Sequence, residues 1–174
     1  FSHFDHDPFD PFSISNNSIH TIYKDRQNTM WVGTYSSGIS YYNSLLLKFG
    51  HYKLQPGNRR SINDNHVNVI FEEDDKLWIG TEGGLNVYDK RDKIFRYYMN
   101  EHNNTSSLSS NAVWAICRDS RNNMWIGAWG GGLNQFHENS KTFTRYQYDE
   151  NNPNSLGGNN IYKIIEDREG YLWL

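Results

Sequence analysis

The sequence has little that would support a disulfide, a membrane helix or a nucleic-acid surface. Its 174 residues include a single cysteine, Cys117, so no disulfide can form within the chain. No apolar run reaches the roughly 18–20 residues of a membrane helix, and any export or anchor segment is expected to lie outside these residues. A formal net charge of −3 without a Lys or Arg block excludes a nucleic-acid partner for this segment. Cys117 lies in an apolar pattern that indicates a buried thiol and not a nucleophile.

Helical patterning is also missing, whereas aromatic residues are plentiful. Aromatic side chains make up 16% of the sequence, with 12 Tyr, 9 Phe and 6 Trp, and residues of this kind favour strands. No ten-residue stretch shows the 3.6-residue periodicity of an amphipathic helix. A chain of this length ordinarily forms one domain. These features predict an all-β fold.

One short phrase recurs along the whole chain. It reads Met-Trp-Ile-Gly from Met124, Leu-Trp-Ile-Gly from Leu77 and Met-Trp-Val-Gly from Met30, and a fourth copy begins at Leu172. Its tryptophans are Trp31, Trp78, Trp125 and Trp173, so the period is about 47 residues. A fixed period of roughly 20–50 residues indicates a solenoid, a propeller or an array.

Each period divides into four short strands separated by turn residues. The first strand is opened by an Asn and carries apolar residues on both faces, as expected for a strand buried on both sides. The Trp-Ile-Gly strand follows, and then come a strand that ends in an aromatic residue and a strand with the pattern Phe-x-x-Tyr. A polar loop of about ten residues leads to the next period. The opening asparagines are Asn17, Asn65, Asn111 and Asn159.

Four antiparallel strands per period predict a β-propeller of four-stranded blades. Helical repeats lack support here, leucine-rich repeats are shorter, and the Trp-Asp dipeptide of WD-type blades is absent. The chain then holds about three and a half blades. Residues 1–12 form an outer strand and loop of a preceding blade, with Phe1–Phe4 as the strand. Complete blades occupy 13–60, 61–106 and 107–154, and 155–174 begins the next.

Such a half ring would leave two blade faces open to water. Large apolar faces and free strand edges are liabilities for a soluble domain. We therefore expect the remaining blades of a longer chain, or a second copy of this one, to complete the ring.

Two stretches resemble the two-component regulator propeller repeat. Ile164–Trp173 is similar to its beginning, and Leu77–Asp89 is similar to its second half. Two departures occur in other repeats: Ala128 stands in place of Thr, and Ser36-Ser37-Gly38 replaces the glycine run. Both changes affect the turns and leave the resemblance intact.

The resemblance implies the periplasmic sensor region of a Bacteroides-type hybrid two-component system sensor histidine kinase. Such a region has two seven-bladed propellers and a β-sandwich domain, in an inner-membrane protein that forms homodimers. A membrane span, a histidine kinase and a DNA-binding response regulator would lie outside these residues. The ligand implied is a glycan fragment, recognised directly or relayed to the kinase.

Candidate binding residues are the positions that vary between otherwise similar repeats near one rim of the blades. Trp and Tyr offer flat apolar faces to sugar rings, and Asn, His and Glu can hydrogen-bond hydroxyl groups. The recurring tryptophans Trp31, Trp78 and Trp125 are instead expected to pack between blades. The candidates are His20, Asn68, Trp114 and Tyr162 on the first strands, and Tyr35, Glu82 and Trp129 after the second strands.

The sequence contains few residue patterns typical of catalytic or metal sites. We therefore expect no enzyme, no cofactor and no metal site in this chain. His3, Asp5, His6 and Asp7 lack a matching group elsewhere, and the acidic run 72–75 fits a solvated hairpin turn. Two alternatives to a glycan sensor remain open. A propeller lyase or hydrolase would have to use His20, Glu82 and Tyr162, and a structural propeller would bind proteins and no small ligand.

Overall fold

The computed structural model describes residues 3–43, 48–58 and 60–174. These residues form strands, turns and loops, without a helix long and apolar enough to cross a membrane. The chain divides into two compact units. Unit 1 comprises Phe1–Ile79 and Asn86–Arg96, and unit 2 comprises Gly80–Leu85 and Tyr97–Leu174.

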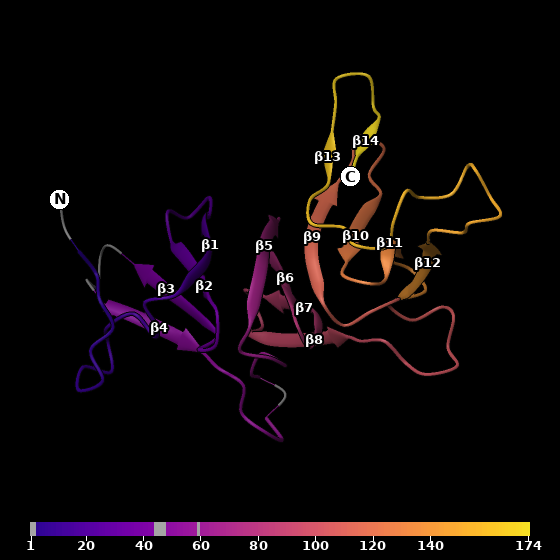
Figure 1. The fold of residues 1–174 in the computed structure, drawn as a ribbon. Helices are drawn as coiled ribbons and strands as arrows, with labels where there is room; N and C mark the ends of the chain where they lie inside the picture. Colours follow the sequence, from indigo (N-terminus) through magenta and orange to yellow (C-terminus); the bar gives the residue numbers. More distant parts are fainter. Residues whose placement is uncertain (1–2, 44–47, 59) are drawn as a thin grey trace. The chain divides into compact units, whose positions relative to one another are not determined.

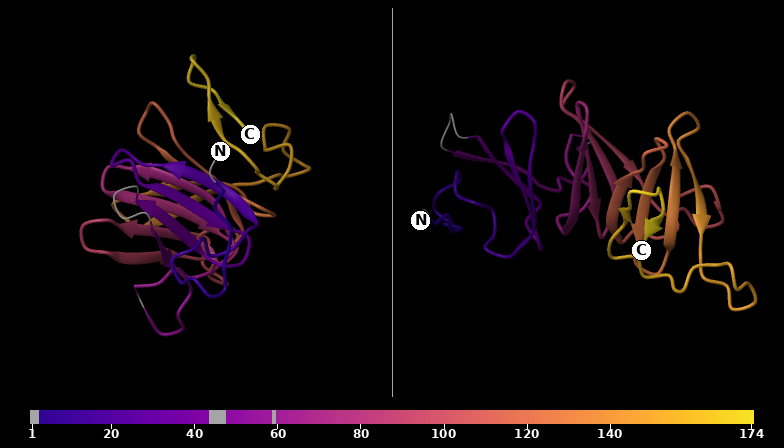
Figure 2. Two further views of the ribbon diagram at one scale, coloured as in Figure 1. Left: turned by 90° about the vertical axis from the view of Figure 1, so that its left-hand side faces the viewer. Right: turned by 90° about the horizontal axis from the view of Figure 1, so that it is seen from above.

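The strands form three four-stranded sheets, each with its strands in chain order, and one short hairpin (Figures 1 and 2). The first sheet has β1 (Ile19–Lys24), β2 (Met30–Thr34), β3 (Ile39–Asn43) and β4 (Lys48–Tyr52). The second has β5 (Val67–Glu73), β6 (Lys76–Thr81), β7 (Gly84–Asp89) and β8 (Ile94–Tyr98). The third has β9 (Val113–Arg118), β10 (Met124–Ala128), β11 (Gly132–His137) and β12 (Thr142–Tyr146), and the hairpin has β13 (Ile165–Glu166) and β14 (Leu172–Trp173). Neighbouring strands run antiparallel, so the predicted all-β fold of four-stranded blades is confirmed.

The strand expected at Phe1–Phe4 is not observed. Phe1 lies outside the described residues, and residues 3–7 form no strand because no described strand pairs with them. Phe4 nevertheless packs where its counterparts do, with its ring centroid 5.4 Å from that of Tyr42 and 5.6 Å from that of Phe49. Aromatic packing therefore anchors this segment without a backbone ladder.

The asparagine at the start of each first strand makes a hydrogen bond across the loop that precedes it. Its side-chain oxygen accepts a hydrogen bond from the backbone N–H eleven residues earlier, at 2.7–2.8 Å in all four repeats. Asn side chains commonly satisfy loop backbone in this way. The four donor–acceptor pairs are His6–Asn17, Leu54–Asn65, Asn100–Asn111 and Tyr148–Asn159.

The glycine of the Trp-Ile-Gly strand allows the next first strand to approach closely. A Cβ atom on Gly33 would lie 2.7 Å from Val67 Cγ1, and one on Gly127 would lie 2.5 Å from Ile161 Cγ2. Real Cβ atoms do not come this close, so any larger residue would push the two segments apart. In unit 1, β5 accordingly packs against β1 and β2 (Figure 1).

An aspartate at the end of the first strand holds the tryptophan of the second strand. In the first repeat, the indole N–H of Trp31 donates to Asp25 Oδ2 at 2.8 Å. The backbone N–H of Thr29 donates to the other oxygen, Oδ1, at 2.8 Å. The same arrangement recurs for Asp119 with Trp125 and Asn123, and for Asp167 with Trp173 and Tyr171.

Unit 1 also buries an ion cluster between its sheets. Lys90 Nζ donates to Asp25 Oδ2 at 3.2 Å and to Glu72 Oε1, and the side chains of Asp25 and Glu72 are 3% and 1% exposed. Glu72 Oε2 also accepts from the hydroxyl of Tyr23. The expectation of a solvated acidic turn at 72–75 is therefore wrong for Glu72, because Glu72 lies within β5, which packs against β1 of the neighbouring sheet.

Replacing Lys90 by Met should destabilise the fold by about 3 kcal/mol, because Asp25 and Glu72 would remain buried without their shared cation. Arg91→Met provides the matched control, since Arg91 pairs with Asp75 at the surface and its side chain is 78% exposed. Urea unfolding followed by tryptophan fluorescence measures both. Equal midpoints for the two variants would contradict the stabilising role of the buried cluster.

Acid should weaken the Asp–Trp hydrogen bonds. Burial alone would raise the pKa of Asp119, but hydrogen bonds from Trp125, Asn123 and Arg121 outweigh it and hold that pKa below its usual value. A lowered pKa in the folded state adds stability above the unfolded pKa of about 3.8, and this stability is lost as the pH falls below it. The free energy of unfolding should therefore drop as the pH falls below about 4 and through the folded-state pKa of Asp119, and that of Asp119→Asn should drop less. An equally steep acid limb in Asp119→Asn would refute this account.

Candidate ligand-binding surface

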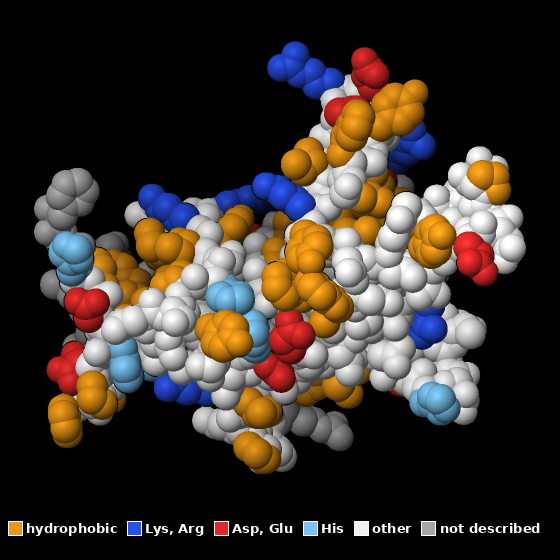
Figure 3. Space-filling model, viewed as in Figure 1, with side chains coloured by type: hydrophobic (Ala, Val, Ile, Leu, Met, Phe, Trp, Pro, Cys, Tyr) orange, Lys and Arg blue, Asp and Glu red, His pale blue; other side chains and the backbone are white. Residues whose placement is uncertain are grey.

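One rim of each sheet carries the positions that vary between repeats. After the second strand, the backbone N–H of Tyr35 donates to Ser18 O at 3.0 Å, and that of Trp129 donates to Ala112 O at 2.8 Å. These bonds place the residue after the second strand beside the entry of the first strand. In Figure 3, hydrophobic side chains reach the surface in small groups interrupted by histidine and acidic side chains.

In unit 2, three of the predicted residues form one aromatic cluster. The ring centroids of Trp114 and Trp129 are 5.7 Å apart, and that of Tyr162 lies 5.7 Å from Trp114 and 5.2 Å from Trp129. Trp129 is 45% exposed and Tyr162 is 56% exposed, whereas Trp114 is half-buried. We call these three residues the aromatic platform.

The aromatic platform contains one unsatisfied donor. The indole nitrogen of Trp114 is buried and makes no hydrogen bond to any described residue. Nearby, the backbone N–H of Gly130 donates to Asn160 Oδ1 at 2.9 Å, which fixes the turn that carries Trp129. A buried donor without a partner costs free energy that a ligand oxygen can recover.

In unit 1, the equivalent rim holds a mixed cluster of two predicted residues and one that sequence reasoning missed. The ring of His66 lies 4.3 Å from that of Tyr35 and 5.0 Å from that of His20, and the rings of His20 and Tyr35 are 5.2 Å apart. His66 Nε2 is buried and without a partner among the described residues. Asn65, the residue before His66, has a counterpart in every repeat, but His66 itself does not. The sequence pattern therefore did not mark His66 as a candidate.

The other two predicted residues are polar and contribute no ring to these clusters. Asn68 lies on β5 in unit 1 and Glu82 lies in the turn after β6 in unit 2, and both are half-buried. Ring contacts thus bring together five of the seven candidates, two in unit 1 and three in unit 2.

The recurring tryptophans of the first two repeats are more buried than the exposed candidate residues. Trp31 and Trp78 are 6% and 2% exposed, in agreement with the prediction that they pack between blades. Trp125 is half-buried, and its ring lies 5.7 Å from that of Tyr146. Trp173, in the short β13–β14 hairpin, is 66% exposed.

Two further features of the described residues concern metal ligands and the single thiol. The described residues contain no group of three or more His, Cys, Asp and Glu side chains that could hold a metal ion. Burial raises the pKa of the Cys117 thiol, which keeps it protonated and unreactive. The exposed aromatic faces remain as the feature best suited to a ligand with apolar C–H groups.

The two classes of tryptophan should differ in their effect on stability. Trp78→Ala should cost about 4 kcal/mol, because it leaves a cavity in the core. Trp129→Ala should cost about 1 kcal/mol, because it removes only edge contacts with Trp114 and Tyr162. Thermal and urea unfolding measure both changes. A larger cost for Trp129→Ala than for Trp78→Ala would show that the aromatic platform is part of the core.

Comparison with solved structures supports the fold. The extracellular domain of the putative hybrid two component system BT4673 from B. thetaiotaomicron is 26% identical, with a TM-score of 0.75, and the match covers 94% of this chain and 21% of that chain. The corresponding domain of BT3049 from the same organism is 26% identical, with a TM-score of 0.69, and the match covers 99% of this chain and 27% of that one. The present chain therefore spans about a quarter or less of these neighbours.

Sequence comparison points in the same direction. Over 71 residues the chain is 30% identical to histidine kinase P4 of Formosa agariphila, a stretch that covers 40% of this chain and 5% of that protein. The two component regulator propeller family matches at residues 13–36, 61–83, 107–130 and 155–174, more than half of the chain and once in each repeat. The chain belongs to the two component regulator propeller family.

Proposed function

We propose that this chain is part of the extracytoplasmic sensor region of a hybrid two-component signalling protein, and that the aromatic platform binds a glycan fragment. The solved neighbours are extracellular domains of such systems, and the chain carries the propeller repeats of the same family. The observation that carries the ligand class is the convergence of three rings at an exposed rim, beside an unsatisfied indole N–H.

The aromatic platform suits a sugar for two physical reasons. The C–H face of a pyranose ring packs on Trp and Tyr faces, which bury much area at little conformational cost. The Trp114 indole N–H can donate to a hydroxyl oxygen and so recover a hydrogen bond that the unliganded surface lacks. Neither contact requires a charged ligand.

The response to the glycan is a relay and not catalysis. In this proposal the protein is anchored in the inner membrane with this region in the periplasm, and the signal reaches a histidine kinase through a homodimer. Binding changes kinase activity only if the ligand has different affinities for the two signalling states.

Calorimetric titration of the full-length protein with a panel of neutral oligosaccharides tests the proposal. We expect at least one of them to bind, and Trp129→Ala and Tyr162→Ala each to weaken that binding about tenfold, equivalent to about 1.4 kcal/mol. Absence of binding by every member of the panel at millimolar concentration would refute direct glycan recognition.

Tyr148→Ala is the matched control, because Tyr148 is a 51% exposed tyrosine of the same unit. Among the described residues, its one hydrogen bond runs from its backbone N–H to Asn159, so its ring should not matter for affinity. If Tyr148→Ala weakened binding as much as Tyr162→Ala, the affinity would not depend on the aromatic platform.

A further inference from the structure

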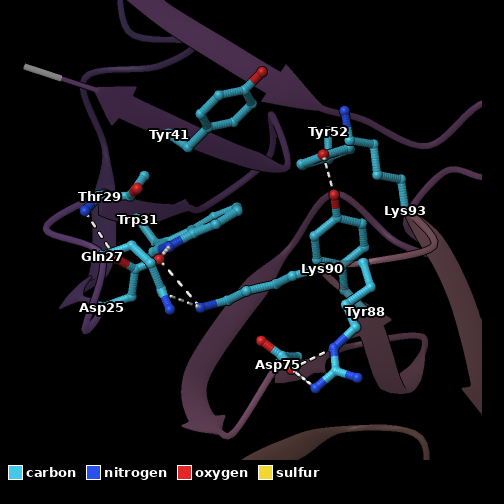
Figure 4. A pocket seen from close by; sticks show the side chains of 11 residues that line it. Asp25, Gln27, Thr29, Trp31, Tyr41, Tyr52, Asp75, Tyr88, Lys90 and Lys93 are labelled. Atoms are coloured by element: carbon cyan, nitrogen blue, oxygen red, sulfur yellow. Dashed lines mark hydrogen bonds and ion pairs between the residues drawn. The ribbon is translucent and has the colours of Figure 1, made fainter. Parts of the chain in front are cut away.

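Unit 1 contains a cavity at the end of its strands opposite the His20–Tyr35 cluster. The strand β1 runs from Ile19, paired with Thr34, to Lys24, paired with Met30. The cavity lies beyond Lys24, where the β1–β2, β5–β6 and β7–β8 turns meet, and its volume is about 380 Å³ (Figure 4). Ligand pockets typically measure roughly 300–1,000 Å³, so this one has room for a single small ring.

Four aromatic side chains line this cavity. The ring of Trp31 lies 5.5 Å from that of Tyr41 and 6.4 Å from that of Tyr52, with the Trp31 and Tyr52 planes inclined by only 13°. The hydroxyl groups of Tyr52 and Tyr88 are 2.5 Å apart and share a hydrogen bond. Burial raises the pKa of both phenols, so both stay neutral. The result is an uncharged aromatic wall.

Tyr41 reaches this wall because its cross-strand partner is a glycine. Tyr41 pairs with Gly50, and a Cβ atom on Gly50 would lie 2.0 Å from Tyr41 Cζ. The ring of Tyr41 therefore lies directly across the backbone of β4, a position that any other residue at 50 would deny it.

Neither of the other two four-stranded sheets repeats this pair. In the third sheet the cross-strand partners at the same place are Gln135 and Thr144, and Tyr146 donates a hydrogen bond to Gln135. In the second repeat the counterparts of Tyr41 and Gly50 are Val87 and Arg96. Tyr41 and Gly50 are thus a local change that the common framework does not require, and its effect is an extra ring at the cavity.

The charged groups around the cavity leave one cation without an acidic partner. Lys90 Nζ is engaged by Asp25, Glu72 and Gln27, and Arg91 pairs with Asp75. Lys93 is exposed and forms no ion pair with any described residue, and Figure 4 shows it beside Tyr52. An unpaired lysine beside an aromatic wall favours a ring that carries an anion.

Uncharged polar side chains complete the lining of the cavity. Thr29 and Gln27 lie on the β1–β2 turn, and the hydroxyl of Tyr41 makes no hydrogen bond to another described residue. A hydrocarbon or a simple aromatic acid would leave the hydroxyls of Thr29 and Tyr41 without partners, whereas sugar hydroxyls can satisfy them.

We propose that this cavity is a second ligand site, separate from the aromatic platform, and that it takes a single acidic sugar ring such as a hexuronate. The apolar face of the sugar packs against Tyr41 and Tyr52, its carboxylate pairs with Lys93, and its hydroxyls meet Thr29 and Gln27. The assignment depends only on these residues of unit 1 and does not rest on glycan binding at the aromatic platform.

Titration of the full-length protein with glucuronate, glucose and benzoate, followed by ligand-observed NMR, tests the site. We expect glucuronate to bind at least tenfold more tightly than either glucose or benzoate. Tyr41→Val, which installs the residue of the second repeat, should weaken glucuronate binding at least tenfold. Lys93→Met should weaken glucuronate binding about tenfold and leave glucose binding unchanged.

Two control variants show whether the effects are specific to this cavity. Lys141 occupies the same turn position in the third sheet, where its N–H donates to His137 O as that of Lys93 donates to Asp89 O, so Lys141→Met should not affect binding. Trp129→Ala should also leave glucuronate affinity unchanged, which separates this site from the aromatic platform. The proposal is overturned if glucuronate does not bind, if glucose or benzoate binds as tightly, or if Lys93→Met has no effect.

Discussion

The structure depends on how closely one first strand approaches the second strand of the preceding sheet. At Gly33 there is no room for a Cβ atom between Thr21 and Val67, and at Gly127 there is none between Ala115 and Ile161. Such contact fixes the separation of adjacent segments within each unit, since protein interiors are packed without slack.

The polar contacts repeat because this spacing repeats. In unit 1 the carboxylate of Glu72 accepts the backbone N–H of Arg26 at 3.2 Å, and in unit 2 that of Glu166 accepts the N–H of Ser120 at 2.8 Å. Both bonds join the turn after one first strand to the end of the next first strand. Unit 1 adds Lys90, which neutralises the buried carboxylate of Glu72. A carboxylate buried this deeply would otherwise cost several kcal/mol.

The sequence was sufficient to predict the four strands of each complete repeat, their order and the burial of Trp31 and Trp78, because these follow from local periodicity. It also placed Trp114, Trp129 and Tyr162 on one rim. It could not reveal the burial of Glu72, which depends on Lys90 eighteen residues away, nor the role of Gly50, which emerges only once its pairing with Tyr41 is known. Features that depend on the register between strands leave no pattern that can be recognised in the sequence alone.

The two proposed sites differ from the framework in one physical respect. Framework positions, such as the opening asparagines, satisfy backbone groups that every repeat must satisfy, so they admit little change. Tyr41 and Trp129 satisfy nothing that the fold requires, since neighbouring repeats manage with Val87 and Glu82 at these places. Aromatic rings kept at a surface without a structural need raise the cost of exposed apolar area. A ligand that covers them offsets that cost, which is why we expect these variable positions, more than the recurring tryptophans, at a binding surface.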